Sequence, residues 1–227
     1  MKAEFDRFDQ TYEAELDDAI AFAGREHEFY VEAKARRLLE LARRRLGDRP
    51  LDLLDVGCGP GLTDRHLLPH VASLAGVDPS QGMVERARHE NPRAEYSLYD
   101  GGRLPFDDAT FDLAFAINVL HHVDPRDRRP LVAELGRVTK PDGLVAVFEH
   151  NPLNPLTRRV VRSCAFDEGV ALLGQGELVR LFRAAGLHVA DREYLLFFPW
   201  RADALERRLT RLPLGAQHVV TGRPCSR

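Results

Sequence analysis

Apolar residues follow two different spacings along the chain. Between about Glu32 and Leu46 they recur with a period of about 3.6 residues, which predicts an amphipathic helix that Gly47 ends. Further on, short apolar runs predict strands at Leu51–Val56, Leu74–Val77, Ala94–Leu98, Phe111–Ile117, Leu144–Phe148, Leu187–Ala190 and Gln217–Thr221. The segments between them predict helices up to about Leu68, from the N-cap Ser80 to His89, over Asp127–Val138 and over Glu177–Ala185.

Strands that alternate with helices are typical of an α/β fold, because each crossover helix returns the chain to the start of the next parallel strand. We therefore predict a Rossmann-like, seven-stranded, mostly parallel sheet with helices on both faces. The run Phe111–Ile117 is apolar throughout, which indicates a central strand that is buried on both faces. The sequence Lys140-Pro141-Asp142-Gly143 predicts a turn before the fifth strand.

Three segments lie outside this alternation. The first 30 residues are rich in acidic and aromatic side chains, and we expect them to form an irregular or short-helical lid. The connections Asn151–Gly174 and Tyr194–Leu214 are longer than the fold needs, and long ordered connections often carry function. The prediction is one domain, 1–227, with the lid and first helix in 1–48, a cofactor-binding core in 49–150, and substrate-side insertions with the last strands in 151–227.

The overall composition is that of an ordinary globular protein. Of the 227 residues, 44% are apolar and 30% are charged, and the net charge is −3. This balance gives no general attraction to nucleic acid or to anionic membranes. Neither a signal-peptide pattern nor an apolar stretch of about 20 residues occurs, so a cytoplasmic protein with no membrane or nucleic-acid partner is expected. The oligomeric state is left open.

Neither the cysteines nor the arginines of the sequence favour another function. Cys58, Cys164 and Cys225 lack the close spacing of a zinc or redox motif, so we expect reduced, mostly buried thiols and no metal site. The basic run Arg36, Arg37 and Arg43–Arg45 could form a nucleic-acid patch, but a solvated helix face is favoured.

Polar residues and glycines gather at the predicted strand ends. In an open parallel sheet, ligands bind beyond the carboxyl ends of the strands, so these residues belong to one site. The first end reads LLDVGCGPG, where glycines let the backbone approach a ligand closely. The later ends carry Asp78 and Pro79, then Asp100, then Asn118 with His121 and His122, and finally Glu149, His150 and Asn151.

The glycine spacing distinguishes between two nucleotide cofactors. A dinucleotide-binding turn reads G-x-G-x-x-G and places pyrophosphate on a helix N-terminus. Here the spacing is G-x-G-x-G, and Asp55, two residues before the first glycine, would repel a pyrophosphate. That arrangement suits a ligand with a cationic amino-acid tail or a sulfonium, such as S-adenosylmethionine, and disfavours an NAD-dependent oxidoreductase.

Five motifs in this order resemble those of the class I S-adenosylmethionine-dependent methyltransferases. They are DVGCGPG, VDPSQGMVERAR, YDGGRLPFDDATFDL, VLHHV and ELGRVTKPDG, and they cover about residues 51 to 150. Asp142-Gly143 stands where the family usually has two glycines. The motifs look like the small-molecule branch that includes quinone C-methyltransferases. The segment EHNPLNPLTRRVVRSCAFDEG is similar to one in uncharacterised bacterial relatives and identifies no substrate.

The resemblance implies a role for each matching position. The methionine portion of the cofactor would be held by Asp55 and by the loop residues Gly57, Cys58, Gly59 and Gly61. The adenosine portion would be bound by Asp78 and Pro79 at the ribose, by Met83 packed on the adenine, and by Asp100 with Gly101 at the adenine edge. Asn118 would lie beside the methyl donor, and Phe8 and Tyr12 resemble the aromatic lid of such enzymes.

Methyl transfer requires alignment above all, and a base only where the acceptor must lose a proton. His150 and His122 follow strands on the binding edge and are the candidate catalytic residues, although His121 and His122 could instead orient the backbone. We expect a small-molecule acceptor, methylated on oxygen, nitrogen or carbon. Its wall is expected from the lid and the long connections, through Phe166, Tyr194, Phe197, Phe198, Trp200, Arg158, Arg159 and Arg162, which hint at an apolar acceptor with an anionic or polar end.

Two other functions remain open at this point. Nucleic-acid methyltransferases that act on amino groups carry a Pro-Pro-aromatic tetrapeptide after the fourth strand, whereas here Asn118 is followed by Val119-Leu120-His121. The other alternative is a cofactor-binding relative or partner subunit without catalysis, because fold and cofactor do not prove turnover.

Overall fold

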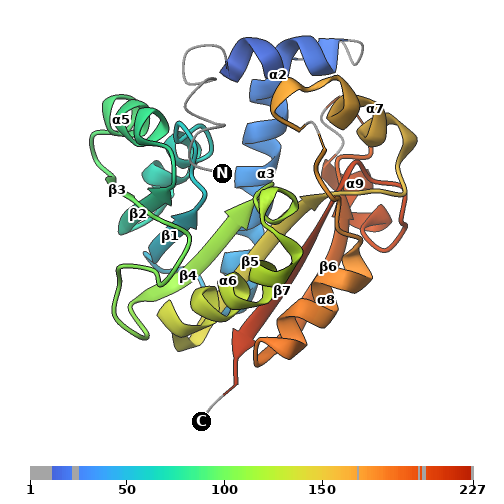
Figure 1. Ribbon diagram of the computed structural model, residues 1–227. Helices are drawn as coiled ribbons and strands as arrows, with labels where there is room; N and C mark the ends of the chain where they lie inside the picture. Colours follow the sequence, from blue (N-terminus) through green and yellow to red (C-terminus); the bar gives the residue numbers. More distant parts are fainter. Residues whose placement is uncertain (1–11, 22–25, 168, 199, 201–202, 226–227) are drawn as a thin grey trace.

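A sheet of seven strands runs through the centre of the molecule (Figure 1). The computed structural model describes residues 12–21, 26–167, 169–198, 200 and 203–225. The strands are β1 (Asp52–Val56), β2 (Ser73–Asp78), β3 (Glu95–Leu98), β4 (Phe111–Ile117), β5 (Thr139–His150), β6 (Leu187–Leu195) and β7 (Gln217–Pro224). Their order in space is β3-β2-β1-β4-β5-β7-β6, and only β7 runs antiparallel to its neighbours. This confirms the predicted mostly parallel sheet.

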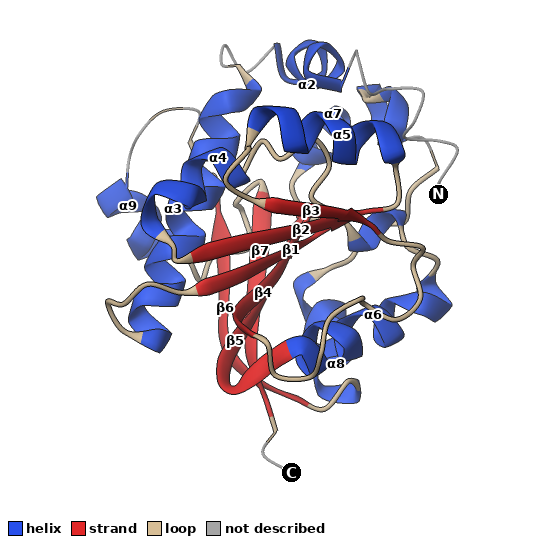
Figure 2. Ribbon diagram, turned by 90° about the vertical axis from the view of Figure 1, so that its left-hand side faces the viewer, coloured by secondary structure: helices blue, strands red, loops and turns tan. Residues whose placement is uncertain are grey.

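Helices cover both faces of the sheet (Figure 2). They are α2 (Tyr12–Ile20), α3 (His27–Leu46), α4 (Asp64–Leu67), α5 (Gln81–Glu90), α6 (Pro125–Val138), α7 (Pro155–Ser163), α8 (Gln175–Ala184) and α9 (Asp203–Leu209). Short 3-10 turns occur at Leu68–His70 (η2), Leu120–His122 (η3) and Ala165–Asp167 (η4). The helices α3, α4 and α5 pack on one face, and α6 and α8 pack on the other. Among the described residues, no helix combines the length and apolar character needed to cross a membrane.

The core is formed on both faces by alternate residues of the central strands. Ala114 and Ala116 of β4 face α6 and α8, whereas Phe115, between them, faces α3. In β5, Val147 and Phe148 alternate in the same way. The prediction that Phe111–Ile117 is a central strand buried on both faces is therefore confirmed, with the same bounds.

Helix ends follow the predicted capping residues. Ser80 precedes α5, and its Oγ accepts a hydrogen bond of 3.2 Å from the Met83 amide. Gly47 follows α3 with a φ of +85°, and its amide donates to the Arg43 carbonyl at 3.0 Å. These caps fix where the helices begin and end relative to the strand ends that carry the polar residues.

The start of β5 differs from the prediction. Residues 140–143, predicted as a turn before the strand, lie inside β5 and interrupt its pairing: Thr139 pairs with Phe111 and Leu144 with Leu113, so four residues of β5 stand opposite Asp112. Thr139 already pairs with Phe111, and the Lys140 ammonium lies 3.1 Å from a carboxylate oxygen of Asp112. Gly143 permits this close approach, because a Cβ there would lie 2.7 Å from the Asp112 carbonyl oxygen.

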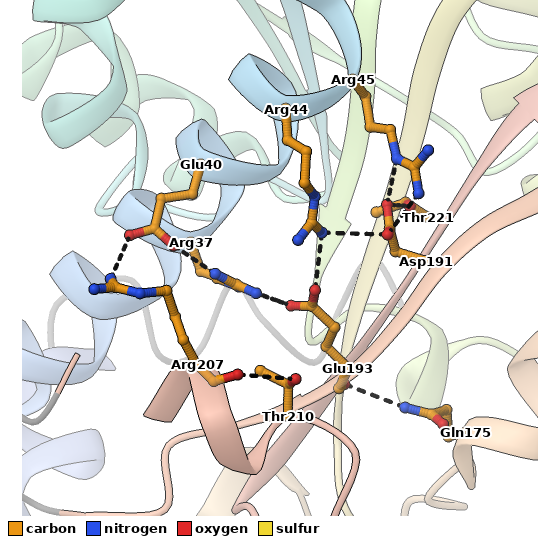
Figure 3. A network of polar contacts seen from close by, with 10 residues as sticks. All are labelled: Arg37, Glu40, Arg44, Arg45, Gln175, Asp191, Glu193, Arg207, Thr210 and Thr221. Atoms are coloured by element: carbon orange, nitrogen blue, oxygen red, sulfur yellow. Dashed lines mark hydrogen bonds and ion pairs between the residues drawn. The ribbon is translucent and has the colours of Figure 1, made fainter. Parts of the chain in front are cut away.

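Arginines of α3 bind the acidic residues of β6 (Figure 3). The Arg45 Nε donates to Asp191 at 2.8 Å, the Arg44 guanidinium donates to Glu193 at 2.8 Å, and Arg37 also binds Glu193. We call this set of contacts the arginine clamp. It forms because β6 continues past Ala190, where the sequence pattern had ended the strand. Arg37, Arg44 and Arg45 are therefore more than a solvated face, because carboxylates of β6 pair with them, whereas Arg43 is exposed as predicted.

A helix lies where a lid was expected. In Figure 1, α2 lies across the upper end of α3 and beside α7, and it contacts both. Glu13 pairs with Arg86 of α5, and the His27 amide donates to Asp17 at 2.7 Å. The segment Tyr12–Ile20 thus contacts three other helices, α3, α5 and α7. The other aromatic residue of the expected lid, Phe8, lies outside the described residues.

Candidate functional site

The loop after β1 is held open by residues in the left-handed conformation. Gly57, Gly59 and Gly61 have φ angles of +81°, +52° and +75°, which side chains with a Cβ rarely adopt. The Gly57 and Cys58 amides donate to the Val77 carbonyl at 2.8 and 3.1 Å, so the loop is attached to the end of β2. We call residues 57–61 the glycine loop.

Asp78 connects the glycine loop to α5. One carboxylate oxygen accepts a hydrogen bond of 2.9 Å from the Gly59 amide, and the other accepts one of 2.9 Å from the Ser80 amide. The residue is buried and stands at the end of β2, beside the point between β1 and β4 where the strand order reverses. Ligands bind at this position in open α/β sheets.

A cavity of about 430 Å³ opens beside the glycine loop. We call it the loop cavity. Nine of the twelve residues predicted to bind a cofactor line it: Tyr12, Gly57, Gly59, Asp78, Pro79, Met83, Asp100, Gly101 and Asn118. The other three, Asp55, Cys58 and Gly61, are not among its lining residues. The structure therefore brings most of the predicted set together around one space.

Asp55, Cys58 and Gly61 lie behind the loop. A Cβ on Gly61 would lie 2.4 Å from the Asn91 amide nitrogen, and Cys58 is buried against Gly76. Asp55 is buried beside Asp64. Its pKa is raised well above the usual value, mainly by burial and in addition by the negative charge of the Asp64 carboxylate. These three residues thus pack the loop against the sheet and α5.

Tyr96 completes the buried group behind the loop. Its hydroxyl donates to Asp64 at 2.7 Å, and burial raises the pKa of Asp64 to about 6. Lys34 of α3 lies near Asp55, and burial lowers the pKa of the lysine to about 8. Asp64, Tyr96 and Lys34 were not predicted from the sequence. The one signal for Lys34 was its place on the apolar stripe of α3, between Val31 and Leu38.

Asn118 ends β4 in a strained conformation. Its φ is +59°, in a region where asparagine is tolerated better than most residues. Its amide donates to the Phe148 carbonyl at 2.9 Å, and its side-chain oxygen accepts from Gln217 at 3.2 Å. Backbone strain of this kind persists only where the surroundings fix it, and it is concentrated at binding sites. The residue therefore marks the inner edge of the loop cavity.

A second cavity of about 430 Å³ lies beyond Asn118. We call it the apolar cavity. Its apolar wall comes from α2, α3, α7 and the segment after β6, through Leu16, Ile20, Tyr30, Val31, Leu156, Val160, Leu196, Phe197 and Phe198. Its polar end holds Lys34, His121, His122, His150, Asp167 and Gln217. Tyr12, Asn118 and His122 line both cavities, so the two spaces adjoin at these residues.

Only some of the residues expected in the acceptor wall line the apolar cavity. Phe197 and Phe198 line the apolar cavity, but Tyr194 and Trp200 line a separate, smaller pocket with Arg36. The three arginines of α7 (Arg158, Arg159 and Arg162) are exposed and do not line the cavity, because α7 turns Thr157 and Val160 toward it. The cation that faces the cavity is Lys34 instead.

Histidines and carboxylates form a connected cluster at the polar end. His121 Nδ1 lies 2.6 Å from Glu149 Oε2, and the other Glu149 oxygen accepts from the Leu120 amide at 2.7 Å. His121 Nε2 and His122 Nε2 lie 3.5 and 3.2 Å from the same oxygen of Asp167. His150, at the end of β5, faces His121 with ring centroids 5.2 Å apart. The cluster joins the ends of β4 and β5 to η4.

The cluster sets different protonation states for its histidines. Burial lowers the pKa of His121, but the charges of Glu149 and Asp167 outweigh it and raise the pKa to about 9. Burial, assisted by the charge on His121, lowers the pKa of His150 to about 3, and burial also lowers the pKa of His122. Near neutral pH, His150 and His122 are therefore uncharged and have nitrogen lone pairs available.

Comparison with known proteins agrees with this geometry. Residues 54–147 match the methyltransferase domain family. The chain is 34% identical over 227 aligned positions to 24-methylenesterol C-methyltransferase 2 of Oryza sativa subsp. japonica, covering 86% of this chain and 61% of the relative. It is 33% identical over 118 positions to 27-O-demethylrifamycin SV methyltransferase of Amycolatopsis mediterranei, covering 49% of this chain and 42% of the relative. The chain thus spans about half the length of the curated relatives it matches.

A solved structure shares the whole fold. The crystal structure of an S-adenosylmethionine-dependent methyltransferase from Thermotoga maritima superposes with a TM-score of 0.69 at 22% identity. The match covers 99% of this chain and 100% of the other. The long connections, α2 and β7 therefore all lie within the part of the chain that the match covers.

Proposed function

We propose that this chain transfers a methyl group from S-adenosylmethionine to a small molecule, because it belongs to the class I S-adenosylmethionine-dependent methyltransferase family. One observation carries the proposal. The loop cavity and the apolar cavity adjoin at Tyr12, Asn118 and His122, so a donor in one and an acceptor in the other would meet there. Relatives that methylate small molecules on carbon or oxygen support the acceptor class.

The residues of the loop cavity fit S-adenosylmethionine. A Cβ on Gly59 would stand in open space at the cavity wall, so this glycine leaves room for a ligand against the backbone. Asp78 lines the cavity at the end of β2 and would accept the ribose hydroxyls. Asp100 and the buried Met83 would bind the adenine edge and its face. When bound, S-adenosylmethionine supplies a methyl group on a positively charged sulfur.

The glycine loop would position the methionine portion of the cofactor through its backbone. Asp55, Cys58 and Gly61 would act indirectly, because they lie behind the loop and fix its shape. Tyr12, from the lid helix, would close the loop cavity at its junction with the apolar cavity. Alignment of donor and acceptor in this way accounts for up to about 7–11 kcal/mol of a reaction barrier.

The apolar cavity favours an acceptor with an apolar body and one polar end. Leu16, Val31 and Phe197 would contact the body, and Lys34 and Gln217 would bind the polar end. His122, at the junction, and His150, farther along the same cavity, are the groups we propose to receive a proton from an acceptor that must lose one. Water would be excluded by α2 and α7, which lie over this end of the sheet (Figure 1).

Calorimetric titration with S-adenosylhomocysteine tests the cofactor assignment, with NADH as the control ligand. We expect a dissociation constant of about micromolar size for the first compound and no binding of the second. Asp78→Asn should weaken binding by more than about tenfold, a loss of about 1.4 kcal/mol or more. The exposed Asp142→Asn is the matched control. Because Asp78 also accepts two backbone hydrogen bonds, thermal melting must first show that the variant is folded.

Turnover is tested separately. The protein and S-adenosylmethionine are incubated with a panel of small apolar acceptors that carry one hydroxyl, amine or carboxylate, and methylated products are sought by mass spectrometry. Product formation supports the proposal. Tight S-adenosylhomocysteine binding without any product across the panel would favour a non-catalytic relative, and binding of NADH alone would contradict the cofactor assignment.

A further inference from the structure

We propose that His121, His150 and Asp167 bind a divalent transition-metal ion, Zn²⁺ by their chemistry, at the polar end of the apolar cavity. One ligand atom from each of the three residues lies within 4.8 Å of the others. The three come from η3, from the end of β5 and from η4, so no local spacing in the sequence reveals the set, and the sequence had predicted no metal site. This inference does not depend on the proposed methyl transfer.

The distance between His121 and Asp167 is that of two ligands around one ion. His121 Nε2 and Asp167 Oδ1 are 3.5 Å apart, which is long for a hydrogen bond between them. In a tetrahedral site, ligand atoms at about 2.0–2.2 Å from Zn²⁺ are separated from one another by about 3.4 Å. His122 Nε2 lies 3.2 Å from the same carboxylate oxygen and is next to the site. His121 and Asp167 are thus spaced for an ion between them, and His150 has a ligand atom within 4.8 Å of both.

Asp167 carries the second, independent observation. Its Oδ1 is buried and has no hydrogen-bond partner of acceptable geometry among the described residues, and its side chain is only 5% exposed. A buried carboxylate oxygen without a hydrogen-bond partner destabilises the folded state unless a cation binds it. The oxygen points toward the two histidine nitrogens, where an ion would satisfy it.

Glu149 orients His121 in the manner of an outer-sphere residue. Its carboxylate lies 2.6 Å from His121 Nδ1, so the ring uses that nitrogen as a donor and presents Nε2 to Asp167. Histidines that bind metals usually donate their second nitrogen to a carboxylate in this arrangement, which fixes the tautomer. Glu149 is itself fully buried and accepts the Leu120 amide, so the ring orientation is firmly held.

Charge and access also suit a divalent cation. Asp167 lines this wall and Glu149 pairs with His121 behind it, so two carboxylates lie beside the site, and Lys34 of α3 also faces the cavity. Three protein ligands leave a tetrahedral ion one open position, as in catalytic zinc sites. All three ligands line the apolar cavity, so the open position would face its contents. With His150 holding the ion, His122 would be the residue left to receive a proton.

Metal titration of the full chain tests the site without any acceptor. The chelator-treated protein is titrated with Zn²⁺ by calorimetry, and with Co²⁺ while the visible absorption is recorded. We expect about one equivalent of either ion per chain and the intense bands of a tetrahedral Co²⁺ complex. Asp167→Asn and His150→Ala should each weaken Zn²⁺ binding by more than about tenfold. The exposed His89→Ala serves as the control for surface histidines.

Each other outcome counts against the site. Absence of stoichiometric binding would mean that a protonated His121 between Glu149 and Asp167 accounts for the cluster. Binding that survives both Asp167→Asn and His150→Ala, or that is lost in His89→Ala, would place the metal elsewhere. If Asp167→Asn does not fold, His150→Ala decides alone, because His150 is only partly buried in a cavity wall. S-adenosylhomocysteine binding, measured in parallel, shows separately whether the proposed function holds.

Discussion

Replacement of Gly57 by alanine tests how the glycine loop is built. The residue has a φ of +81°, and a Cβ would lie 2.5 Å from one methyl carbon of Val119 and 3.0 Å from the other. The left-handed conformation costs an alanine about 1–2 kcal/mol, and crowding of a packed side chain adds about 1–3 kcal/mol. We therefore expect Gly57→Ala to lower the free energy of unfolding by about 2–5 kcal/mol.

Gly59→Ala is the matched control, because it shares the backbone conformation but not the contact. Its φ is +52°, and a Cβ there would meet nothing within 4 Å. Only the strain of about 1–2 kcal/mol is expected for this variant. The added methyl group would, however, stand at the wall of the loop cavity, so S-adenosylhomocysteine binding should fall by more than about tenfold in Gly59→Ala.

Urea denaturation followed by circular dichroism measures both losses, and calorimetry measures the affinity. With a slope of about 2 kcal/mol per molar urea, Gly57→Ala should shift the midpoint by roughly 1–2.5 M. Val119→Ala in the same chain should recover part of the loss, because it removes the crowding carbons. Equal losses in Gly57→Ala and Gly59→Ala, or no coupling with Val119→Ala, would refute the steric argument.

Three further predictions concern other parts of the molecule. Glu193→Gln should lower the free energy of unfolding by about 1–3 kcal/mol, because Arg37 and Arg44 lose the charged partner that they share. The exposed Glu90→Gln is the control and should cost little, and urea denaturation measures both variants. Burial raises the pKa of Asp112, but hydrogen bonds from Arg49, the Asp52 amide and Lys140 lower it from 3.8 to about 2. Its stabilising contribution is therefore present above pH 3.8 and lost as the pH falls toward 2, so Asp112→Asn should weaken the acid dependence of stability, and an unchanged pH profile would contradict this. Once an acceptor is found, His150→Ala and His122→Ala should lower turnover far more than S-adenosylhomocysteine affinity, and the variant with an unaffected rate would be excluded as the proton acceptor.

Local patterns were sufficient to predict the sheet and the loop cavity. The strand Phe111–Ile117 and the cap at Ser80 depend on nearest neighbours in the chain, and both are as predicted. The residues predicted to bind a cofactor come together because parallel strands present all their carboxyl ends at one edge. The turn over residues 140–143 was placed before the fifth strand because Pro and Gly favour turns locally, whereas pairing of Thr139 with Phe111 starts the strand earlier and leaves these residues as an interruption inside it.

Contacts between segments that are far apart in the chain could not be predicted from local sequence patterns. Arg45 and Asp191 are 146 residues apart, so the sequence showed only a basic run on a helix. The meeting of Asp167 with His121 likewise depends on how the connection after β5 folds back over the sheet. Lys34 was different, because a lysine on the apolar stripe of a helix is a readable sign of a buried cation.

The position of β7 has a consequence for how the protein is made. Gln217–Pro224 is synthesised after β6 but lies between β5 and β6 in the sheet. Until those residues leave the ribosome, Leu187–Leu195 has no neighbouring strand, and the edge of β5 is open to other chains. The half of the sheet from β3 to β4 can form early, whereas completion of the sheet and of the arginine clamp waits for the last strand. A nascent or proteolysed chain that lacks it would therefore be prone to aggregate through that edge.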